Sequence, residues 1–302
     1  MRESPQAHLI DSGRRLHLHH GPIDLIIEAT GDFHEIRAAY EAATTRFATI
    51  LDELCEELSF LRSQTSPGSP LPNGRVARRM VNAVLPFSAR EFITPMAAVA
   101  GSVAEEISGI MTRTAYLKKV FVNNGGDIAL HLAPGESISV GMVQRPDALS
   151  LFGTLQIRFT DPVRGIATSG WRGRSFSLGI ADAVTILAAT SSMADAAATV
   201  IANAVDLPGH PEILRIPARE IAPDSDLGEL PVTRSVGKLK SEEIDNALSR
   251  GQIVTEQLMA EELICGAALH LQGETRIAHS PDYLPYSVFH KSEMLSTRNA
   301  IA

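Results

Sequence analysis

Two oxygen-bearing side chains lie one helical turn apart in residues 191–205, a segment that the sequence predicts to enter a helix. Asp195 and Thr199 are four residues apart, so both oxygens face the same side of that helix. Because Ser191 or Ser192 suits the N-cap, Asp195 falls in the predicted first turn, near the electropositive end. Two oxygens on one helix face near that end are candidates for a ligand site. The local sequence favours a simpler alternative, in which Asp195 complements the helix dipole and Thr199 bonds back to a carbonyl.

A glycine turn carries the second group of candidate residues, in the stretch VFVNNGGD at residues 120–127. A buried strand breaks there at two asparagines, and a second apolar strand follows. Gly125 and Gly126 lack a Cβ, so their backbone can approach another surface closely. Asp127 comes next and is the best candidate for a general base or a polar anchor. We expect the other candidate residues to converge on this turn.

A loop rich in glycine and arginine, at residues 165–175, contains the only tryptophan of the chain. Backbone N–H groups near Ser169 and Gly170 could cradle the oxygens of an anionic ligand, and Arg172 or Arg174 could hold its phosphate. The spacing matches neither a Walker A motif nor a dinucleotide fingerprint. The loop therefore indicates an anion site without identifying the ligand.

Two predicted helices contain residues that would suit a ligand site but also have simpler explanations. Arg75, Arg78 and Arg79 lie near one another on a short predicted helix and could meet phosphate, although a solvated face is the more frequent reason for such a group. Gly101 lies inside a helix of small residues at 97–107, at a cost of about 1 kcal/mol relative to alanine. Close approach of a ligand and close contact between two helices explain this glycine equally well.

The elements that must position these residues can be predicted from apolar periodicity. Alternation predicts an N-terminal hairpin at residues 15–29, and an apolar stripe predicts a long helix at residues 33–62. Residues 63–74 have the composition of a flexible loop. Short strands with turns between them favour antiparallel sheets over βαβ units. The remaining predicted strands lie at residues 119–122, 128–132, 137–143, 153–159, 178–188, 264–271 and 275–278, and two further helices at 241–250 and from there to about 262.

Histidine and cysteine give weaker signals. His17 and His19 share one face of a predicted strand beside His20, but no Cys, Asp or Glu stands at a recognised metal-ligand spacing, so solvent-facing histidines are expected. Cys55 and Cys265 are the only cysteines, too few for a disulfide framework, which indicates a reducing compartment. Both are expected to be core thiols. A cysteine-based sulfur carrier is the weaker alternative, because neither belongs to a C-x-x-C pair.

Composition argues against several classes of protein. The 302 residues suffice for a hydrophobic core, and 44% apolar with 21% charged residues is ordinary for a soluble globular chain. A formal net charge of -8 without a basic run argues against nucleic acid or an anionic membrane as the main partner. No segment predicts a signal peptide or a transmembrane helix. The expected location is the cytoplasm.

Three stretches, in their order along the chain, resemble the ApbE-like superfamily, which includes the FAD:protein FMN transferases. They are VNNGGDIAL at residues 122–130, ATSGWRGRS at 167–175 and MADAAAT at 193–199. The pattern over about residues 16–277 is most similar to an uncharacterised branch described as thiamine-biosynthesis ApbE-like. Segments typical of that branch are HGPIDLIIEA, TPMAAVAGSVAEEI, RGIATSGWRGRSFSLGIADAVTILA and ANAVDLPGHP. The specificity lies in the combination, since no single motif is diagnostic.

The resemblance implies an α+β fold of ApbE-like architecture, with mainly antiparallel sheets and helices packed around one ligand cleft. It predicts a single domain at residues 1–280, with the flexible insert at about 63–74 and an irregular tail at 281–302. The implied cofactors are Mg²⁺ and a flavin nucleotide, FAD or FMN, or a similar nucleotide diphosphate. A protein acceptor and a homo-oligomer stay open as partners, whereas nucleic acid and membrane are not expected.

The family motifs assign roles to individual residues. The aspartate and threonine of the motif A-D-A-x-A-T hold magnesium in the family and correspond to Asp195 and Thr199, which favours a metal role for both. A small-residue helix supplies a further backbone oxygen, for which Ala100 is the closest match. The remaining correspondences are the glycine pair with an acid or amide, Gly125-Gly126-Asp127, and the serine-glycine loop, Ser169-Gly170.

Two departures from the family pattern separate two hypotheses. Ala100 precedes Gly101 where the transferases carry a lysine, and residues 176–183 lack the block H-x-x-D-P-x-T-G. The retained phosphate and metal residues favour a Mg²⁺-dependent enzyme, either an FMN transferase or a nucleotide-diphosphate hydrolase similar to an FAD pyrophosphatase. The missing block favours a non-catalytic accessory protein that binds flavin or another anion.

Overall fold

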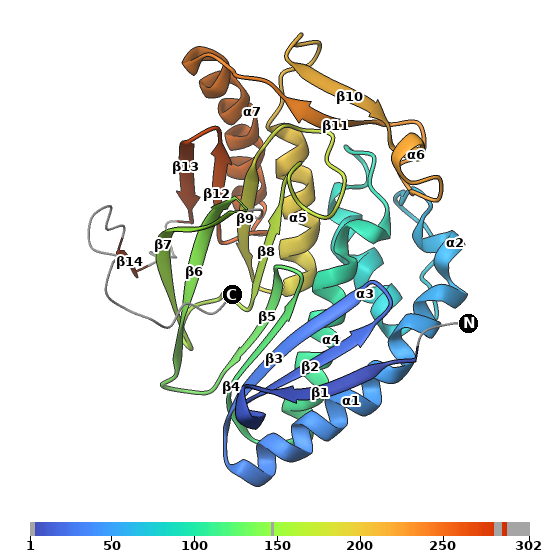
Figure 1. The fold of residues 1–302 in the computed structure, drawn as a ribbon, viewed down its shortest axis with the longest axis vertical. Coiled ribbons are helices and arrows are strands. Elements are labelled where there is room, and N and C mark those ends of the chain that lie inside the picture. The colour runs from blue at the N-terminus through green and yellow to red at the C-terminus, as the bar shows by residue number, and fades with distance from the viewer. Residues whose placement is uncertain (1–3, 146–147, 281–285, 289–302) are drawn as a thin grey trace. The chain divides into compact units, whose positions relative to one another are not determined.

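The computed structural model describes residues 4–145, 148–280 and 286–288, and the chain divides into two compact units. The first unit comprises the chain up to Glu136 together with Val163–Ala167 and Leu187–Ala197. The second comprises Ser137–Pro162, Thr168–Ile186 and the chain from Ala198 onward. Each unit contains helices and antiparallel strands (Figure 1). A single domain over residues 1–280 stays a prediction.

The strands of the first unit follow the order β1-β2-β3-β4-β5-β8 and pair antiparallel. Leu16 pairs with Ile27 and Leu18 with Leu25, and all four side chains are buried. Alternate residues of these strands therefore face one core, which confirms the predicted N-terminal hairpin. The strands are β1 (Gln6–Ile10), β2 (Arg15–His20), β3 (Ile23–Gly31), β4 (Leu117–Asn124), β5 (Asp127–Leu132) and β8 (Gly165–Ser169).

Helices pack against the strands of the first unit (Figure 1). Phe47 on α1 and Ile107 on α4 lie in one buried cluster with Leu18 and Leu25 of the sheet. An apolar stripe at helical spacing thus buries its face against an apolar face of alternating strand residues. The helices are α1 (Phe33–Glu56), α2 (Leu58–Leu61), α3 (Arg75–Val84) and α4 (Val99–Thr114), with short 3-10 turns η1 (Asp11–Gly13), η2 (Leu85–Phe87) and η3 (Pro95–Ala98).

The helix predicted over residues 33–62 is interrupted at Glu57. Its φ of -108° and ψ of 13° leave the helical region, so α1 ends before it and α2 begins after it. The Glu57 carboxylate accepts hydrogen bonds from the backbone N–H groups of Asn73 (2.6 Å) and Gly74 (2.9 Å). The Glu57 carboxylate therefore holds the end of the 63–74 loop immediately before α3 begins. The prediction of one continuous helix is wrong at Glu57.

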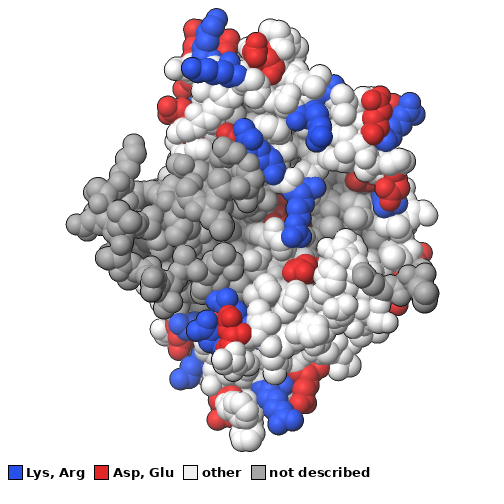
Figure 2. All heavy atoms as spheres, in the orientation of Figure 1, with Lys and Arg blue, Asp and Glu red and all other residues white. Residues whose placement is uncertain are grey.

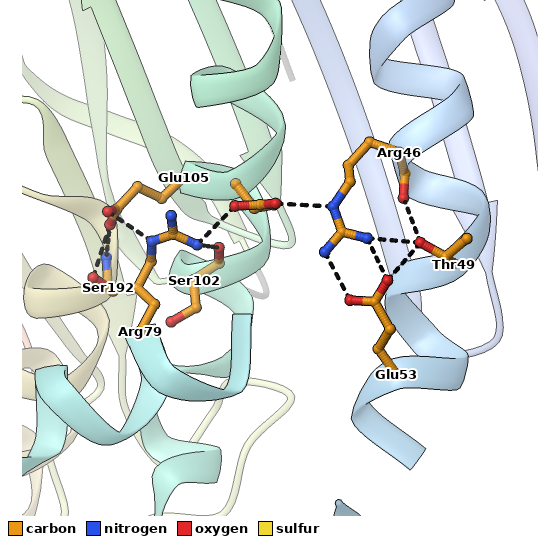
Figure 3. Close-up of polar contacts among 8 residues, drawn as sticks. Arg46, Thr49, Glu53, Arg79, Ser102, Glu105 and Ser192 are labelled. Carbon is orange, nitrogen blue, oxygen red and sulfur yellow. Dashed lines mark hydrogen bonds and ion pairs between the residues drawn. The ribbon is translucent and has the colours of Figure 1, made fainter. Parts of the chain in front are cut away.

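A buried ion-pair network joins α1, α3 and α4 (Figure 3). Glu106 on α4 is only 1% exposed and accepts from Arg46 Nε at 2.8 Å and Arg79 Nη1 at 3.2 Å. Arg46 also forms a two-bond pair with Glu53. Burial by itself would raise the pKa of Glu106, but the two arginines outweigh it and lower that pKa below its ordinary value.

The second unit contains the other strands and the C-terminal helix. β6 and β7 pair antiparallel, as do β7 with β14, β10 with β11, and β12 with β13. In this unit the strand order β9-β12-β13 forms one sheet segment. The helix α5 (Ser191–Ala204) begins in the first unit and ends in the second. The other elements are β6 (Ser137–Arg145), β7 (Ala148–Arg158), β9 (Ala183–Ala188), β10 (Ile213–Pro217), α6 (Ala218–Ile221), β11 (Pro231–Val236), α7 (Ser241–Ala260), β12 (Gly266–Leu271), β13 (Glu274–His279) and β14 (Tyr286–Val288).

The predicted α+β fold with mainly antiparallel sheets is confirmed, but two further local predictions are wrong. The apolar strand at 178–188 is shorter, because residues 178–182 bond outside a strand ladder, for example Ile180 N–H to the Val205 carbonyl. The two helices predicted at 241–262 form a single helix, α7, whose Gly251 packs tightly against Val205 and Leu269. In the predicted irregular tail, β14 is a strand, and residues 281–285 and 289–302 lie outside the described residues.

Charged side chains of both signs are interspersed on the face shown in Figure 2. Among the described residues drawn on that face, the basic side chains form no continuous surface. That nucleic acid is not a partner stays a prediction. Among the described residues, every helix is too short or too polar to cross a bilayer. The cytoplasmic location stays a prediction.

Replacing Glu106 with glutamine should lower the free energy of unfolding by about 3 kcal/mol, because the change leaves two arginines beside a buried neutral amide. Urea titration followed by far-UV circular dichroism measures the effect. The carboxylate contributes stability above its unfolded pKa and loses it as the pH falls through its lowered folded pKa, so the loss should shrink in acid.

Glu41→Gln is the matched control, since Glu41 pairs with Arg37 on the exposed face of α1. It should change the free energy of unfolding by less than about 0.5 kcal/mol. Equal losses in the two variants would show that the Glu106 network does not stabilise the first unit.

Candidate functional site

The N-terminus of α5 differs by one residue from the expected one. The helix begins at Ser191, and Thr190 before it caps the helix by accepting a hydrogen bond from the Met193 N–H at 3.3 Å. Ser191 and Ser192 are therefore the first helical residues and not caps. Asp195 consequently lies just beyond the first turn, so the prediction that it complements the dipole of its own helix is wrong.

Asp195 instead lies at the N-terminus of another helix. Its Oδ2 accepts the Gly101 N–H at 2.9 Å, and the Ala100 N–H also donates to the carboxylate. Ala100 and Gly101 belong to the first turn of α4, where backbone N–H groups have no partner within the helix. The half-buried Asp195 carboxylate therefore complements the dipole of α4, 94 residues away in sequence.

Gly101 is required because α4 and α5 approach each other closely. A Cβ at this position would lie 2.3 Å from the Ser191 carbonyl oxygen and 3.0 Å from the Asp195 Cβ. Of the two explanations that the sequence left open, helix-helix contact accounts for this glycine. The same contact brings the N–H groups of α4 within reach of Asp195.

Asp195 has an environment that opposes its negative charge. Burial raises its pKa well above the ordinary value of 3.8, and the nearby Asp127 carboxylate raises it further. The N–H groups of Gly101 and Ala100 lower the pKa but are outweighed. Two acids from distant parts of the chain thus converge in the first unit.

The turn before Asp127 is held by its two asparagines. Gly125 and Gly126 have φ of 66° and 116°, a region that side chains rarely adopt, and no atom lies within 4 Å of a Cβ built on Gly126. Asn123 Oδ1 accepts the Gly126 N–H at 2.8 Å, and Asn124 Nδ2 donates to the Ala100 carbonyl at 3.1 Å. The glycines are therefore explained by the backbone conformation, and their contact with a ligand stays a prediction.

The donors around Asp195 fit a hard divalent cation. The Asp195 and Asp127 carboxylates supply only oxygen. The Ala100 carbonyl already accepts from Asn124 Nδ2 and, as a residue of α4, from the helical N–H four residues further on. Thr199 lies one turn further along α5. No group of three His, Cys, Asp or Glu side chains in the described ranges could hold a metal ion by itself. A cation here would need oxygens from water or from a ligand phosphate.

The remaining predicted residues lie in the second unit. Ser169 ends β8, and at Gly170 (φ 154°) a Cβ would lie 2.7 Å from the Asp182 carbonyl oxygen, so Gly170 is packed against backbone. Arg172 donates from Nε to Asp182 at 2.6 Å, and its guanidinium lies 4.3 Å from the Trp171 ring centroid. Arg174 is exposed. Phosphate binding by either arginine stays a prediction, since Arg172 already pairs with a buried carboxylate.

Sequence reasoning missed a second contact between α4 and α5. Glu105 Oε2 accepts from the Ser192 hydroxyl at 2.7 Å and from its N–H at 3.2 Å, while Oε1 accepts from Arg79 Nε at 2.9 Å (Figure 3). Glu105 and Ser192 are 87 residues apart, so no local pattern indicates their contact. Arg79, one of the three arginines noted on α3, is the member of this contact that the sequence analysis singled out.

The histidine and cysteine alternatives gain no support from the structure. His17 and His19 both contact the Asp24 carboxylate, at 3.2 and 3.1 Å, across the β2-β3 pair. Cys55 and Cys265 are half-buried free thiols. Burial raises the pKa of Cys265, which disfavours the thiolate that a sulfur carrier needs.

Comparison with known proteins gives a family match over most of the chain. The family model described as AbpE bacteria matches residues 7–277. A UPF0280 protein of Methanopyrus kandleri is 38% identical over 141 residues, which cover 46% of this chain and 52% of the relative. A UPF0280 protein of Methanosarcina acetivorans is 33% identical over 184 residues, which cover 61% of this chain and 70% of the relative. The matched part thus spans about half of the first relative's length.

Two solved structures are also similar. The flavin transferase ApbE from Vibrio cholerae is 12% identical, with 91% of this chain and 98% of that chain covered and a TM-score of 0.39. The ApbE protein from Thermotoga maritima is 14% identical, with 84% and 78% covered and a TM-score of 0.38. Sequence identities and TM-scores this low give no information about the residues of the candidate site.

Gly101→Ala should destabilise the protein by about 3 kcal/mol, because the added Cβ meets the rigid backbone of Ser191. Gly109→Ala on the same helix is the control. Its Cβ would meet only the end of the Arg113 side chain, at 3.0 Å, and the gain in helix propensity is about 1 kcal/mol. Urea unfolding of both variants decides the matter. If Gly101→Ala is as stable as Gly109→Ala, the proposed close contact is incorrect.

Asp195→Asn should change how stability depends on pH. The pKa of Asp195 is higher in the folded than in the unfolded chain, so the folded protein binds more protons between those two values. Stability of the cation-free protein therefore falls as the pH rises through that window. In EDTA, the asparagine variant should lose less stability than wild type as the pH rises above the ordinary aspartate pKa, measured by thermal unfolding. A steeper loss in the variant would contradict the assigned pKa direction.

Proposed function

The chain belongs to the family described as AbpE bacteria, and on that premise we propose that it binds a flavin nucleotide, FAD or FMN, together with a divalent cation such as Mg²⁺. The protein is ApbE-like, and the nucleotide and the cation are the two parts of the proposal. Both rest on the motifs that resemble the ApbE-like superfamily and on the chemistry of the residues at those motifs.

The observation that carries the proposal is the convergence of Asp195 and Asp127 beside the N-terminus of α4. Structural carboxylates in proteins are usually compensated by arginine or lysine, as Glu106 is. Asp195 receives hydrogen bonds from backbone N–H groups, and the charge of Asp127 opposes its ionisation. A strongly perturbed acid with a like-charged neighbour is typical of functional sites. A divalent cation would offset the repulsion between the two carboxylates and favour the ionised form of both.

Each residue has a role that its chemistry allows. Asp195 would hold the cation, and the family resemblance implies the Ala100 carbonyl and the Thr199 hydroxyl as further oxygen ligands. When bound, the cation would neutralise the charge of the nucleotide phosphates. Asp127 would serve as a further anchor or as a base. Backbone of Gly125 and Gly126 would border the ligand.

The structure of residues 176–183 favours a second candidate function, binding without transfer. This segment replaces the H-x-x-D-P-x-T-G block of the transferases, and its polar groups are engaged in packing. Asp182 accepts from Arg172 and from the Gln272 N–H at 2.7 Å, and Ser177 bonds Asn203. With these groups engaged and no lysine before Gly101, an accessory protein that only binds the nucleotide is the alternative to an enzyme.

Isothermal titration with FAD in Mg²⁺ tests the binding proposal. Wild type should bind, and EDTA should weaken binding. Asp195→Asn should weaken it at least about tenfold, as loss of one charged ligand predicts. Asp161→Asn in the second unit is a control that removes a carboxylate outside the predicted site. Binding that is absent in wild type, or unaltered by Asp195→Asn, would refute the proposal.

Incubation with FAD, Mg²⁺ and a threonine-containing acceptor peptide separates the enzyme from the accessory protein. An FMN transferase or a pyrophosphatase-like enzyme releases AMP from FAD, which chromatography detects. AMP release that Asp195→Asn abolishes would exclude the accessory protein. Binding without AMP release would exclude these two enzymes. The acceptor, the oligomeric state and the cytoplasmic location stay predictions.

A further inference from the structure

A pocket of about 440 Å³ lies in the first unit beside α3 and is separate from the contact between Asp195 and Gly101. Its volume suits a small organic molecule. Arg75, Arg78 and Asn82 line it from α3, and Thr190 and Ser192 line it from the start of α5. All of these residues belong to the first unit. The pocket therefore offers a role for the arginines of α3, which take no part in the proposed function.

The arginines reach the pocket from one side of α3. Positions 75, 78, 79 and 82 are separated by three and four residues, which places them on one helix face. Arg79 is compensated, because it donates to Glu105 at 2.9 Å and to Glu106 at 3.2 Å. Figure 3 shows Arg79 extended toward Glu105, on the side of Ser192. The charge of Arg79 is thus neutralised inside the protein.

Arg75 and Arg78 leave positive charge available in the pocket. Arg75 is exposed, and within the described part of the chain it forms no hydrogen bond or ion pair. The pKa of Glu53 is lowered chiefly by Arg46, with a smaller contribution from the charge of Arg75. Arg78 donates from Nε to the Pro72 carbonyl at 2.6 Å, a contact with an uncharged group. Neither guanidinium forms an ion pair with the one acid that lines the pocket, Glu105, although the charge of Arg75 interacts with Glu53.

A carboxylate of the protein, Glu105, lies on the α5 side of the pocket. The Glu105 carboxylate accepts both the hydroxyl and the N–H of Ser192 at the start of α5. This carboxylate fixes the Ser192 side of the pocket and leaves the Arg75 and Arg78 side as the region of uncompensated charge. Arginine forks match the geometry of phosphate oxygens and bind them by charge-assisted hydrogen bonds.

We infer that this pocket binds the phosphate group of a small ligand through Arg75 and Arg78, independently of a cation at Asp195. Ser192 and Glu105 lie about one helical turn from Asp195 and Gly101 on their respective helices, so the two sites share α4 and α5 but no ligand residue. Asn82 adds an amide that can bond a phosphate oxygen or the remainder of the ligand.

Isothermal titration with inorganic pyrophosphate, in EDTA at low salt, tests the inference on the full chain. Wild type should bind, and Arg75→Gln/Arg78→Gln should weaken binding at least about tenfold through the loss of two charge-assisted contacts. Asn82→Asp keeps both arginines but adds a negative charge to the same wall, and should weaken binding to a similar extent. This second variant serves as the test if the double variant does not fold by circular dichroism.

Two controls separate this site from the proposed cation site. Arg37→Gln removes an exposed arginine of α1 and should change pyrophosphate affinity less than about twofold. Asp195→Asn should also leave it unchanged in EDTA, whatever the outcome of the FAD titration. Absence of binding to wild type, equal binding to the double variant, or loss confined to Asp195→Asn would each overturn the inference.

Discussion

The close approach of α4 to α5 at Gly101 is the constraint on which the rest of the first unit's site depends. Because Gly101 has no Cβ, its backbone can lie against the Ser191 carbonyl, and its N–H then reaches the Asp195 carboxylate. Any side chain at this position would separate the helices and leave the first N–H groups of α4 without that acceptor. Packing and charge placement are therefore one requirement here and cannot be altered independently.

The negative charges of the carboxylates around α4 are compensated in different ways. The difference distinguishes carboxylates that stabilise the fold from the one that is a candidate for function. Glu106 pairs with Arg46 and Arg79, which makes it a structural acid that ties three helices together. Glu105 shares Arg79 and also accepts from the start of α5. Asp195 pairs with neither arginine nor lysine, and the charge of Asp127 raises its pKa. Only the last arrangement has the perturbed pKa that is typical of functional sites.

The sequence predicts well those features that local pattern determines. Alternation of apolar residues predicts the β2-β3 hairpin because each strand buries one face, and helical periodicity predicts α1 up to the break at Glu57. Errors occur where a distant group decides. The backbone N–H groups of Asn73 and Gly74 donate to Glu57, the residue at which the predicted long helix breaks into α1 and α2. The Val205 carbonyl accepts from Ile180, which lies in a segment that was predicted to be a strand. The motif resemblance places Asp195 near Ala100, but the pairing of Arg172 with Asp182 follows from no pattern.

The Glu57 carboxylate has a consequence for how this part of the chain can vary. It fixes the backbone at Asn73 and Gly74, while Thr65 at the other end of the loop donates its N–H to the Ile93 carbonyl. Both ends are thus anchored independently of what lies between them. Doubling such a loop costs only about 0.6 kcal/mol of closure entropy. Insertions between Thr65 and Asn73 can therefore accumulate in related chains while α3 and its arginines keep their positions.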